Sequence, residues 1–262
     1  GYIAMNEDGT YNQTLFEWAK QYGIATGFVV SCGITHATPA SFYAHVSDRN
    51  KYESIAYQLK DANIDFAAGG QRNHFLSNKR KDGLDIMDSL TKRNYTVVTE
   101  LNNLDSCKSD KIIALLTKKH PSSASHRHDL LSVCTKKALT VLSNDTNGFV
   151  LMIEGSQIDW ACHANNFPYF KEEIIDFDDV VKIVYDFAFE NGETLVIITA
   201  DHECGDMKVL DSINKIDKKE AYKKIAKYVS FHSFEHTGVN VPIYAFGPGA
   251  ELFQGVMENT SI

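Results

Sequence analysis

The chain has 262 residues, of which 44% are hydrophobic and 11% aromatic, and it carries a formal charge of −8. So much apolar material can form a sizeable core, which argues against a disordered protein. The acidic balance argues against a nucleic-acid-binding surface, and no window approaches the roughly 18 uninterrupted apolar residues of a membrane helix. We therefore expect a folded protein with neither nucleic acid nor membrane as its partner.

Short apolar runs alternate with segments of helical period along the chain. In chain order we expect a helix at 13–23, a strand at 23–31, a helix at 39–47, strands at 64–70 and 111–116, a helix at 128–143, a strand at 147–155, a helix at 178–192, and strands at 193–200 and 241–247. This alternation predicts an α/β fold whose mostly parallel sheet is covered by helices on both faces. We expect residues 1–262 to form a single domain, with a polar excursion at about 73–110.

Polar and charged side chains follow one predicted strand where it ends. Glu154 closes the strand at 147–155, and Asp159 and His163 follow it. Because these two residues are four positions apart, a helix would place both on one face, where they could bind one Zn²⁺. An Asp-x-x-x-His pair also arises by chance on surface helices, so this spacing alone leaves both interpretations open.

Two further clusters bring more candidate ligands. Asp201 and His202 directly follow the predicted strand at 193–200, and a solvated loop pair is the alternative interpretation. His232 and His236 precede the strand at 241–247. If that strand were parallel to the others, these histidines would lie at the wrong edge of the sheet. They reach the site only if the strand runs antiparallel or a loop carries them across.

A fourth cluster follows the first predicted strand. His36 lies in the turn, Thr38 is predicted to be the N-cap of the helix at 39–47, and Arg49 is expected near the far end of that helix. The Thr38 hydroxyl is also a possible oxygen ligand for Mg²⁺, and the fork of Arg49 suits phosphate, although a lone Arg is usually a surface residue.

The five cysteines are widely spaced and form no zinc-binding pattern, so we interpret them as ordinary buried thiols. They are Cys32, Cys107, Cys134, Cys162 and Cys204.

Taken together, the order and spacing of these stretches resemble the alkaline phosphatase family over nearly the whole chain. By this resemblance, one zinc site is complete and consists of Asp159, His163 and His236. The resemblance also makes Asp201 and His202 part of a second zinc site. Two zinc sites are therefore expected, together with a magnesium site.

The remaining positions follow from the same resemblance. Glu154 and Thr38 correspond to ligands of the magnesium site, and Arg49 to the arginine that clamps phosphate. His36 and Trp160 lie where family members vary near the metals, so the resemblance implies that they tune metal preference.

The resemblance implies hydrolysis of phosphate monoesters by in-line displacement at phosphorus. Family members use two zinc ions about 4 Å apart and a serine that forms a phosphoserine intermediate. The resemblance further implies a periplasmic or extracellular location and a possible homodimer.

One part of the family pattern is not found. The nucleophilic serine of the family lies in an Asp-Ser-Ala motif, and an upstream aspartate bridges the second zinc and the magnesium. The Asp-Ser pairs of this chain lack the following Ala; they are Asp88-Ser89, Asp105-Ser106 and Asp211-Ser212. We therefore expect a truncated phosphatase that lacks N-terminal strands of the sheet and is inactive by itself.

Two alternatives remain open. The chain could be a catalytically silent metal-binding or interaction protein on the same scaffold. It could also be another hydrolase or mutase of the same superfamily, such as a sulfatase-like hydrolase or a phosphoglycerate mutase. An in-frame Asp-Ser-Ala segment in the upstream coding sequence would favour the phosphatase.

Overall fold

The computed structural model describes residues 1–210 and 225–262, which fold into two compact units. We call Gly1–Ser156 unit 1 and Gln157–Ile262 unit 2. Glu154 therefore belongs to unit 1, whereas Asp159 and the later candidate ligands belong to unit 2. That 1–262 form a single domain stays a prediction.

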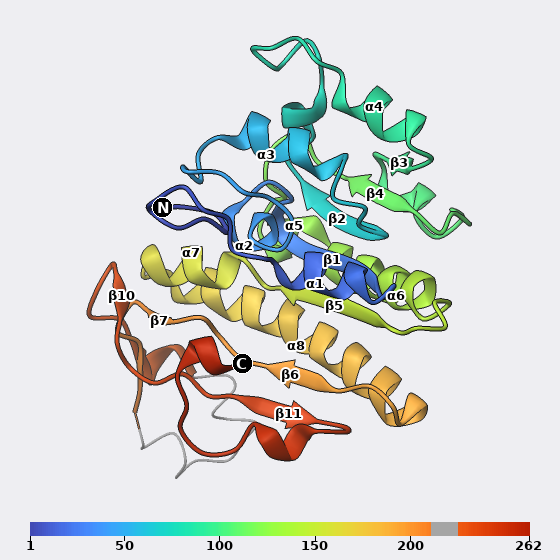
Figure 1. The fold of residues 1–262 in the computed structure, drawn as a ribbon. Helices are drawn as coiled ribbons and strands as arrows, with labels where there is room; N and C mark the ends of the chain where they lie inside the picture. The colour runs from blue at the N-terminus through green and yellow to red at the C-terminus, as the bar shows by residue number, and fades with distance from the viewer. Residues whose placement is uncertain (211–224) are drawn as a thin grey trace. The chain divides into compact units, whose positions relative to one another are not determined.

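Unit 1 is built on a five-stranded sheet in the order β3-β4-β2-β1-β5, in which every neighbouring pair is parallel (Figure 1). Its strands are β1 (Ala25–Gly33), β2 (Phe66–Gly70), β3 (Thr96–Val98), β4 (Ile112–Leu115) and β5 (Phe149–Glu154). The parallel sheet is confirmed: β2, β4 and β5 lie within the predicted ranges, and β1 overlaps the strand predicted at 23–31 but ends two residues later. The carboxyl ends of these strands share one edge, where the polar residues of unit 1 gather.

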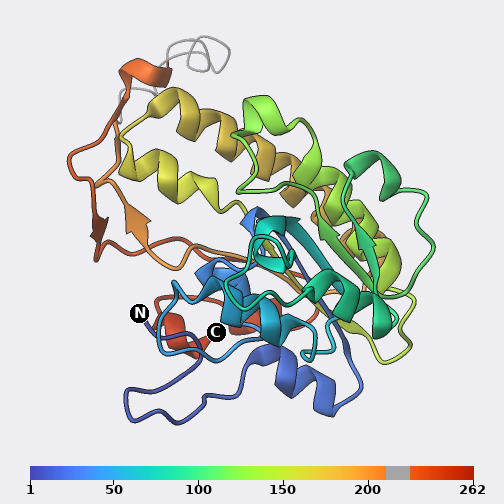
Figure 2. The same cartoon turned by 90° about the horizontal axis from the view of Figure 1, so that it is seen from above.

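Burial explains why the sequence reads as continuous apolar runs here. All nine residues of β1 are buried, as are all of β2 and β4. Helices α1 (Leu15–Gln21) and α6 (Leu130–Leu142) pack against the sheet and cover its two faces (Figure 2). A sheet covered on both faces has no solvent side, so its strands do not alternate between apolar and polar residues.

The predicted helix at 13–23 is confirmed as α1, and its start shows why the sequence specifies it. The Thr14 hydroxyl accepts the N–H of Glu17 at 3.2 Å, and the Glu17 carboxylate accepts the N–H of Thr14 at 2.8 Å. This reciprocal capping satisfies two donors that a helix start leaves unpaired. Gly23, at φ +70°, follows the last turn in the left-handed conformation that glycine commonly adopts after a helix end.

The predicted helix at 39–47 is wrong in extent and in its cap. Helix α2 covers only Ala37–Ala40, and His36 rather than Thr38 holds the N-cap position. Pro39 is tolerated inside the first turn because its missing N–H would have no helical partner there. The following chain leaves the helix because Val46 pairs with Ile3 in an antiparallel bridge.

The segment at about 73–110, expected as a polar excursion, contains the edge strand β3 and two helices, and so has more regular structure than its sequence suggests. Other elements of unit 1 are α3 (Tyr52–Leu59), η1 (Arg72–Phe75), α4 (Ile86–Lys92), η2 (Leu101–Asn103) and α5 (Ala124–Arg127).

The described residues of unit 2 form two α-helices, three short 3-10 helices and short antiparallel strand pairs. Its helices are α7 (Gln157–His163), α8 (Phe167–Asn191), η4 (Ile225–Lys227), η5 (Ala250–Leu252) and η6 (Asn259–Ser261). Its strands pair as β6 (Val196–Ile198) with β11 (Tyr244–Phe246), β7 (Glu203–Cys204) with β10 (His236–Thr237), and β8 (Lys208–Val209) with β9 (Val229–Ser230). None of the described helices is long and apolar enough to cross a membrane.

The longest helix, α8, contains the predicted helix at 178–192 and begins earlier. Asn166 caps its start by accepting the N–H of Tyr169 at 3.2 Å, and Gly192, at φ +72°, ends it. Helix α8 packs against both α7 and β6. It therefore holds α7, which carries Asp159 and His163, in one unit with the strand that leads to Asp201.

Candidate metal centre

Helix α7 places Asp159 and His163 on one face, as their spacing predicts. The Asp159 Oδ1 and His163 Nε2 atoms are 3.5 Å apart, and both side chains are about one-third exposed, at 36% and 35%. Asp159 lies in the first turn, where the helix dipole favours a negative charge. A short helix can thus present one carboxylate oxygen and one imidazole nitrogen to the same point.

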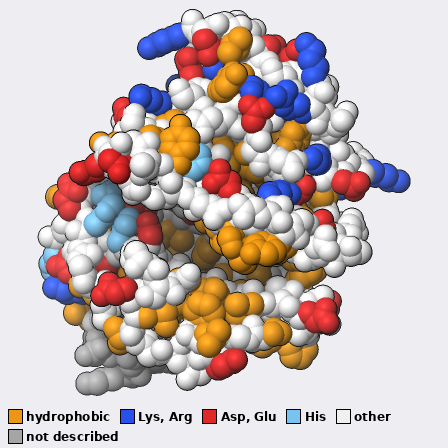
Figure 3. All heavy atoms as spheres, viewed as in Figure 1, with side chains coloured by type: hydrophobic (Ala, Val, Ile, Leu, Met, Phe, Trp, Pro, Cys, Tyr) orange, Lys and Arg blue, Asp and Glu red, His pale blue; other side chains and the backbone are white. Residues whose placement is uncertain are grey.

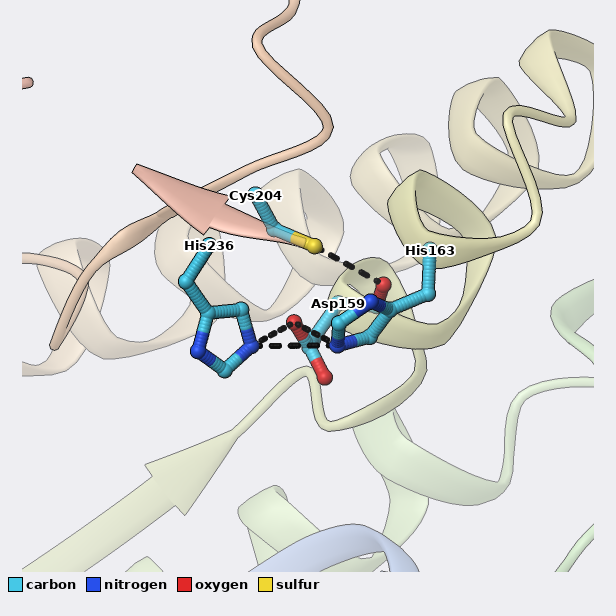
Figure 4. Close-up of side chains that lie close together, drawn as sticks. All are labelled: Asp159, His163, Cys204 and His236. Atoms are coloured by element: carbon cyan, nitrogen blue, oxygen red, sulfur yellow. Dashed lines mark hydrogen bonds and ion pairs between the residues drawn. The ribbon is translucent and has the colours of Figure 1, made fainter. Parts of the chain in front are cut away.

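His236 reaches the same point from strand β10 (Figure 4). Its Nε2 atom lies 3.3 Å from Asp159 Oδ1 and 3.0 Å from His163 Nε2. Strand β11 runs antiparallel to β6, so the chain arriving from His236 enters beside the end of β6. The sequence analysis names an antiparallel strand at 241–247 as one condition for His236 to reach the site, and β11 meets this condition.

The spacing of these three donor atoms matches what one metal ion requires. Zinc binds nitrogen and oxygen ligands at about 2.0–2.1 Å in a tetrahedron, which places two such ligands about 3.3–3.4 Å apart. The observed separations are 3.0, 3.3 and 3.5 Å. In addition, Asp159 Oδ1 is buried and has no hydrogen-bond partner among the described residues. The donor set therefore fits a divalent ion such as Zn²⁺.

A backbone contact orients His163 for this role. Its Nδ1 atom lies 2.5 Å from the carbonyl oxygen of Phe234. When Nδ1 carries the proton and donates it to this carbonyl, the Nε2 lone pair is left for a metal, which is the usual outer arrangement of a ligating histidine.

Asp201 and His202 lie beside this cluster, at the end of β6 and the start of β7. The Asp201 Oδ2 and His202 Nε2 atoms are 3.3 Å apart. The His202 ring stacks on the ring of His236, with centroids 3.5 Å apart and planes at 22°. Its Nδ1 atom is buried and has no hydrogen-bond partner in the described part of the chain. The pair supplies two donors next to the three of the first cluster.

Figure 3 shows histidine side chains gathered with acidic ones on one face, over α7 and β10. His163 and His236 are both part of the surface there, with side chains 35% and 46% exposed. The cluster is therefore accessible to ions and small solutes.

Cys204 is a fourth candidate ligand, which the sequence analysis missed. Together with Asp159, His163 and His236 it forms a group whose ligand atoms all lie within 4.8 Å of one another (Figure 4). The interpretation of Cys204 as an ordinary thiol agrees with its burial, which raises the pKa of its thiol. The available signal was its position two residues after His202 on an extended segment, which places both side chains on one face.

In unit 1, Glu154 and Thr38 both lie beyond the carboxyl end of the sheet. Glu154 is the last residue of β5 and stands opposite Val30 of the parallel neighbour β1. Thr38 lies in α2, which follows β1. The Glu154 carboxylate accepts the Ser156 hydroxyl at 2.5 Å and lies 3.8 Å from the Cys32 sulfur. Burial, with the nearby Glu154 charge, holds the pKa of the Cys32 thiol well above its usual range.

Arg49 lies in a turn rather than near a helix end, because α2 stops nine residues earlier at Ala40. The structure nevertheless brings Arg49 and His36 together, with Arg49 Nη2 3.4 Å from His36 Nε2. The backbone N–H of Arg49 donates to the carbonyl of Gly1 at 2.9 Å, which fixes the turn.

A polar cluster around His120 was also missed. The N–H of Gly33 donates to His120 Nδ1 at 3.0 Å, and the Gln71 amide lies 2.8 Å from His120 Nε2. The Thr35 hydroxyl donates a hydrogen bond to Gln71 Oε1 at 2.6 Å. Burial lowers the pKa of the His120 imidazole. The His36 ring packs edge-on against His120, with centroids 5.8 Å apart, so this cluster supports the end of the sheet where His36 lies.

The comparison with known families decides the identity of this fold. The family model described as alkaline phosphatase matches residues 1–209 and 206–262. The chain belongs to the alkaline phosphatase family. The predicted resemblance is thus confirmed over the whole chain.

Known alkaline phosphatases resemble the chain in sequence and in structure. Alkaline phosphatase 3 of Bacillus subtilis is 30% identical over 331 aligned positions, which cover 99% of this chain and 71% of that protein. The structure of alkaline phosphatase from the Antarctic bacterium TAB5 matches with a TM-score of 0.85 and 37% identity, covering 96% of this chain and 74% of that one.

A variant of the TAB5 alkaline phosphatase, in which a histidine is replaced by Glu, contains Mg bound in a site named M3. It matches with a TM-score of 0.84 and 35% identity, over 96% of this chain and 73% of that one. Metal binding is therefore a property of at least one close structural relative of this chain.

Proposed function

We propose that this chain carries the metal-binding residues of a phosphate monoester hydrolase. The observation that supports this most is the spacing of Asp159, His163 and His236, whose three donor atoms are separated as the ligands of one tetrahedral ion would be. Membership in the alkaline phosphatase family supports the substrate class.

Each residue has a role in this proposal. Asp159, His163 and His236 hold one zinc ion, while Asp201 and His202 supply donors to a second. Glu154 and Thr38 contribute oxygen ligands to magnesium, the ion that is bound in the TAB5 variant. Metal ions stabilise the attacking and leaving oxygens of an in-line displacement when they are bound.

Arg49 binds the phosphoryl oxygens in this proposal. Its planar guanidinium can donate two parallel hydrogen bonds to one phosphate, and the turn around Arg49 is held by the contact of its backbone with Gly1. His36 contacts the guanidinium and tunes the preference of the nearby site for its metal, as we also propose for Trp160 on α7. A dianionic substrate needs such concentrated positive charge, because the chain itself carries a net charge of −8.

We propose that residues 1–262 by themselves do not turn over substrate, because their Asp-Ser pairs do not offer a nucleophile. Ser89 lies in α4 and donates its hydroxyl to the carbonyl of Asp85 at 2.8 Å. Ser106 donates to the carbonyl of Asn103 at 3.2 Å. Both serines thus have local helix and turn roles, and Asp211-Ser212 lies outside the described residues.

The location and the assembly are part of the same proposal. From the resemblance we propose export to the periplasm or the cell surface, and a homodimer.

Elemental analysis of the purified chain, together with hydrolysis of a generic aryl phosphate at alkaline pH, tests the proposal. We expect bound zinc, lost in His163→Ala, and no turnover by residues 1–262. Zinc-dependent turnover would contradict the proposed inactivity, and Ser89→Ala and Ser106→Ala would then identify the nucleophile. A chain that binds no divalent metal would overturn the proposed function.

A further inference from the structure

The strand pair β7–β10 brings a sulfur atom to the cluster on α7. Cys204 and His236 stand directly opposite each other in this antiparallel pair. Directly opposite residues project to the same face, with Cβ atoms about 4.5–5.5 Å apart. Any pairing that delivers His236 to Asp159 and His163 therefore delivers the thiol of Cys204 as well.

The sulfur lies close to the carboxylate helix. Cys204 Sγ is 3.7 Å from the carbonyl oxygen of Asp159, and the residue is 8% exposed. Thiols are weak donors, so this contact costs little to give up. The thiol is thus held at the rim of the metal cluster by a bond that a metal ion can replace.

A tetrahedral ion bound by Asp159, His163 and His236 would have one coordination position left for a further ligand. Three donors from Asp159, His163 and His236 occupy three corners of a tetrahedron, and a zinc–sulfur bond is about 2.3 Å long, which puts a thiolate about 3.6 Å from the other ligands. Because the four ligand atoms lie within 4.8 Å of one another, Sγ needs to move by only about 1 Å to take the fourth corner.

We propose that Cys204 is a fourth metal donor, so that unit 2 alone offers a closed Asp-His-His-Cys site for a thiophilic divalent ion. The inference rests on the proposed function, since it uses the same three ligands. On coordination the thiol releases its proton to solvent and the sulfur binds the metal as thiolate.

This donor set changes what the site prefers. A thiolate favours zinc and other soft ions over magnesium, which prefers oxygen ligands. Catalytic zinc sites have three protein ligands and an open position, whereas structural sites have four. With Cys204 bound, the ion stabilises unit 2, and with Cys204 released the fourth position opens to water or phosphate.

Cobalt substitution tests the proposal with a readout other than activity. Co²⁺ is added to the metal-free full chain, and its absorption spectrum is recorded. We expect ligand-field bands of a tetrahedral site together with a sulfur-to-cobalt charge-transfer band in the near ultraviolet. Cys204→Ser should lose the charge-transfer band and keep bound cobalt.

Cys162→Ser is the matched control, because Cys162 is a second buried thiol, adjacent to His163 in α7 but outside the four-donor cluster. This variant should keep the charge-transfer band. A band that survives in Cys204→Ser and disappears in Cys162→Ser would overturn the proposal. Circular dichroism confirms that each variant is folded.

Cadmium NMR of the unsubstituted chain tests sulfur ligation without any substitution. The ¹¹³Cd resonance of the cadmium-loaded chain should lie downfield, as sulfur ligation requires. Cobalt and cadmium that bind with only nitrogen and oxygen signatures would overturn the role of Cys204 and leave the proposed function intact. A chain that binds neither ion would overturn both.

Discussion

The strands of unit 1 are long and buried, whereas those of unit 2 are short and partly exposed. All nine residues of β1 are buried, but β6 and β11 have three residues each, of which only Val196 is buried. Burial of apolar surface is the main source of folding free energy, so unit 1 is stabilised by its core. The strands of unit 2 bury less apolar surface. We therefore expect a bound metal ion to contribute a larger share of the folding free energy of unit 2 than of unit 1.

The largest effect should come from opening the core of unit 1. Phe28 is fully buried in β1 and stacks against Phe16 and Tyr43, with ring centroids 6.5 and 5.8 Å away. Phe28→Ala should lower the free energy of unfolding by about 3–5 kcal/mol in urea denaturation. Phe189→Ala in α8, where the residue is 68% exposed, should change it by no more than about 0.5 kcal/mol. Equal losses in the two variants would contradict the comparison.

Zinc should stabilise unit 2 rather than unit 1. At a free concentration about 100 times its Kd, a ligand that binds only the folded state adds about 2.7 kcal/mol. Hydrogen exchange followed by mass spectrometry should locate the added protection in α7, β7 and β10. His163→Ala should abolish the effect, whereas His126→Ala, on the exposed surface of α5, should retain it. Protection confined to unit 1 would refute this division.

Removing the cap of α1 should have a moderate effect. Thr14→Ala deletes the hydroxyl that accepts the N–H of Glu17, and thermal unfolding should show a loss of about 1 kcal/mol. Thr14→Ser keeps the hydroxyl and should restore most of the stability. A null result for Thr14→Ala would show that packing of Phe16 alone holds this helix.

An acid sensitivity is expected within unit 1, from His74. Burial lowers the pKa of His74 to about 4, while its unfolded value is near 6.5. The unfolded chain therefore binds more protons between these values, so this contribution to stability is complete above pH 6.5 and is lost as the pH falls to about 4. His74→Gln should flatten the fall in Tm over this window. His126→Gln should leave the slope unchanged, and an identical slope in all three proteins would exclude His74 as its source.

The parts of the fold that depend on local chemistry could be predicted from the sequence. The capping box at Thr14 and Glu17 marks the start of α1, and the apolar run through Phe28 marks β1. The spacing of Asp159 and His163 requires only a helix to bring the two side chains together. Such signals act within a few residues. The helix at 13–23 and the strand through Phe28 are confirmed, and Asp159 and His163 lie on one face of α7, while their role as metal ligands stays a prediction.

The parts that depend on distant partners could not be predicted. The bridge between Val46 and Ile3 ends α2 early and puts Arg49 in a turn. Cys204 joins the metal cluster only because β7 pairs with β10, which lies some thirty residues later. A single buried thiol shows no periodicity that would reveal its neighbours across a strand pair.

The backbone pairing of Cys204 with His236 limits where insertions and deletions can alter the positions of the candidate ligands. The pairs Cys204↔His236 and Glu203↔Thr237 close the base of the intervening stretch, so its length does not set where the ligands stand. The entropy of closing a loop grows only slowly with its length, at about 0.6 kcal/mol for each doubling. Insertions and deletions in the intervening stretch, away from Phe234, should therefore be tolerated more readily than a single-residue shift of the pairing itself, which would turn both ligands away.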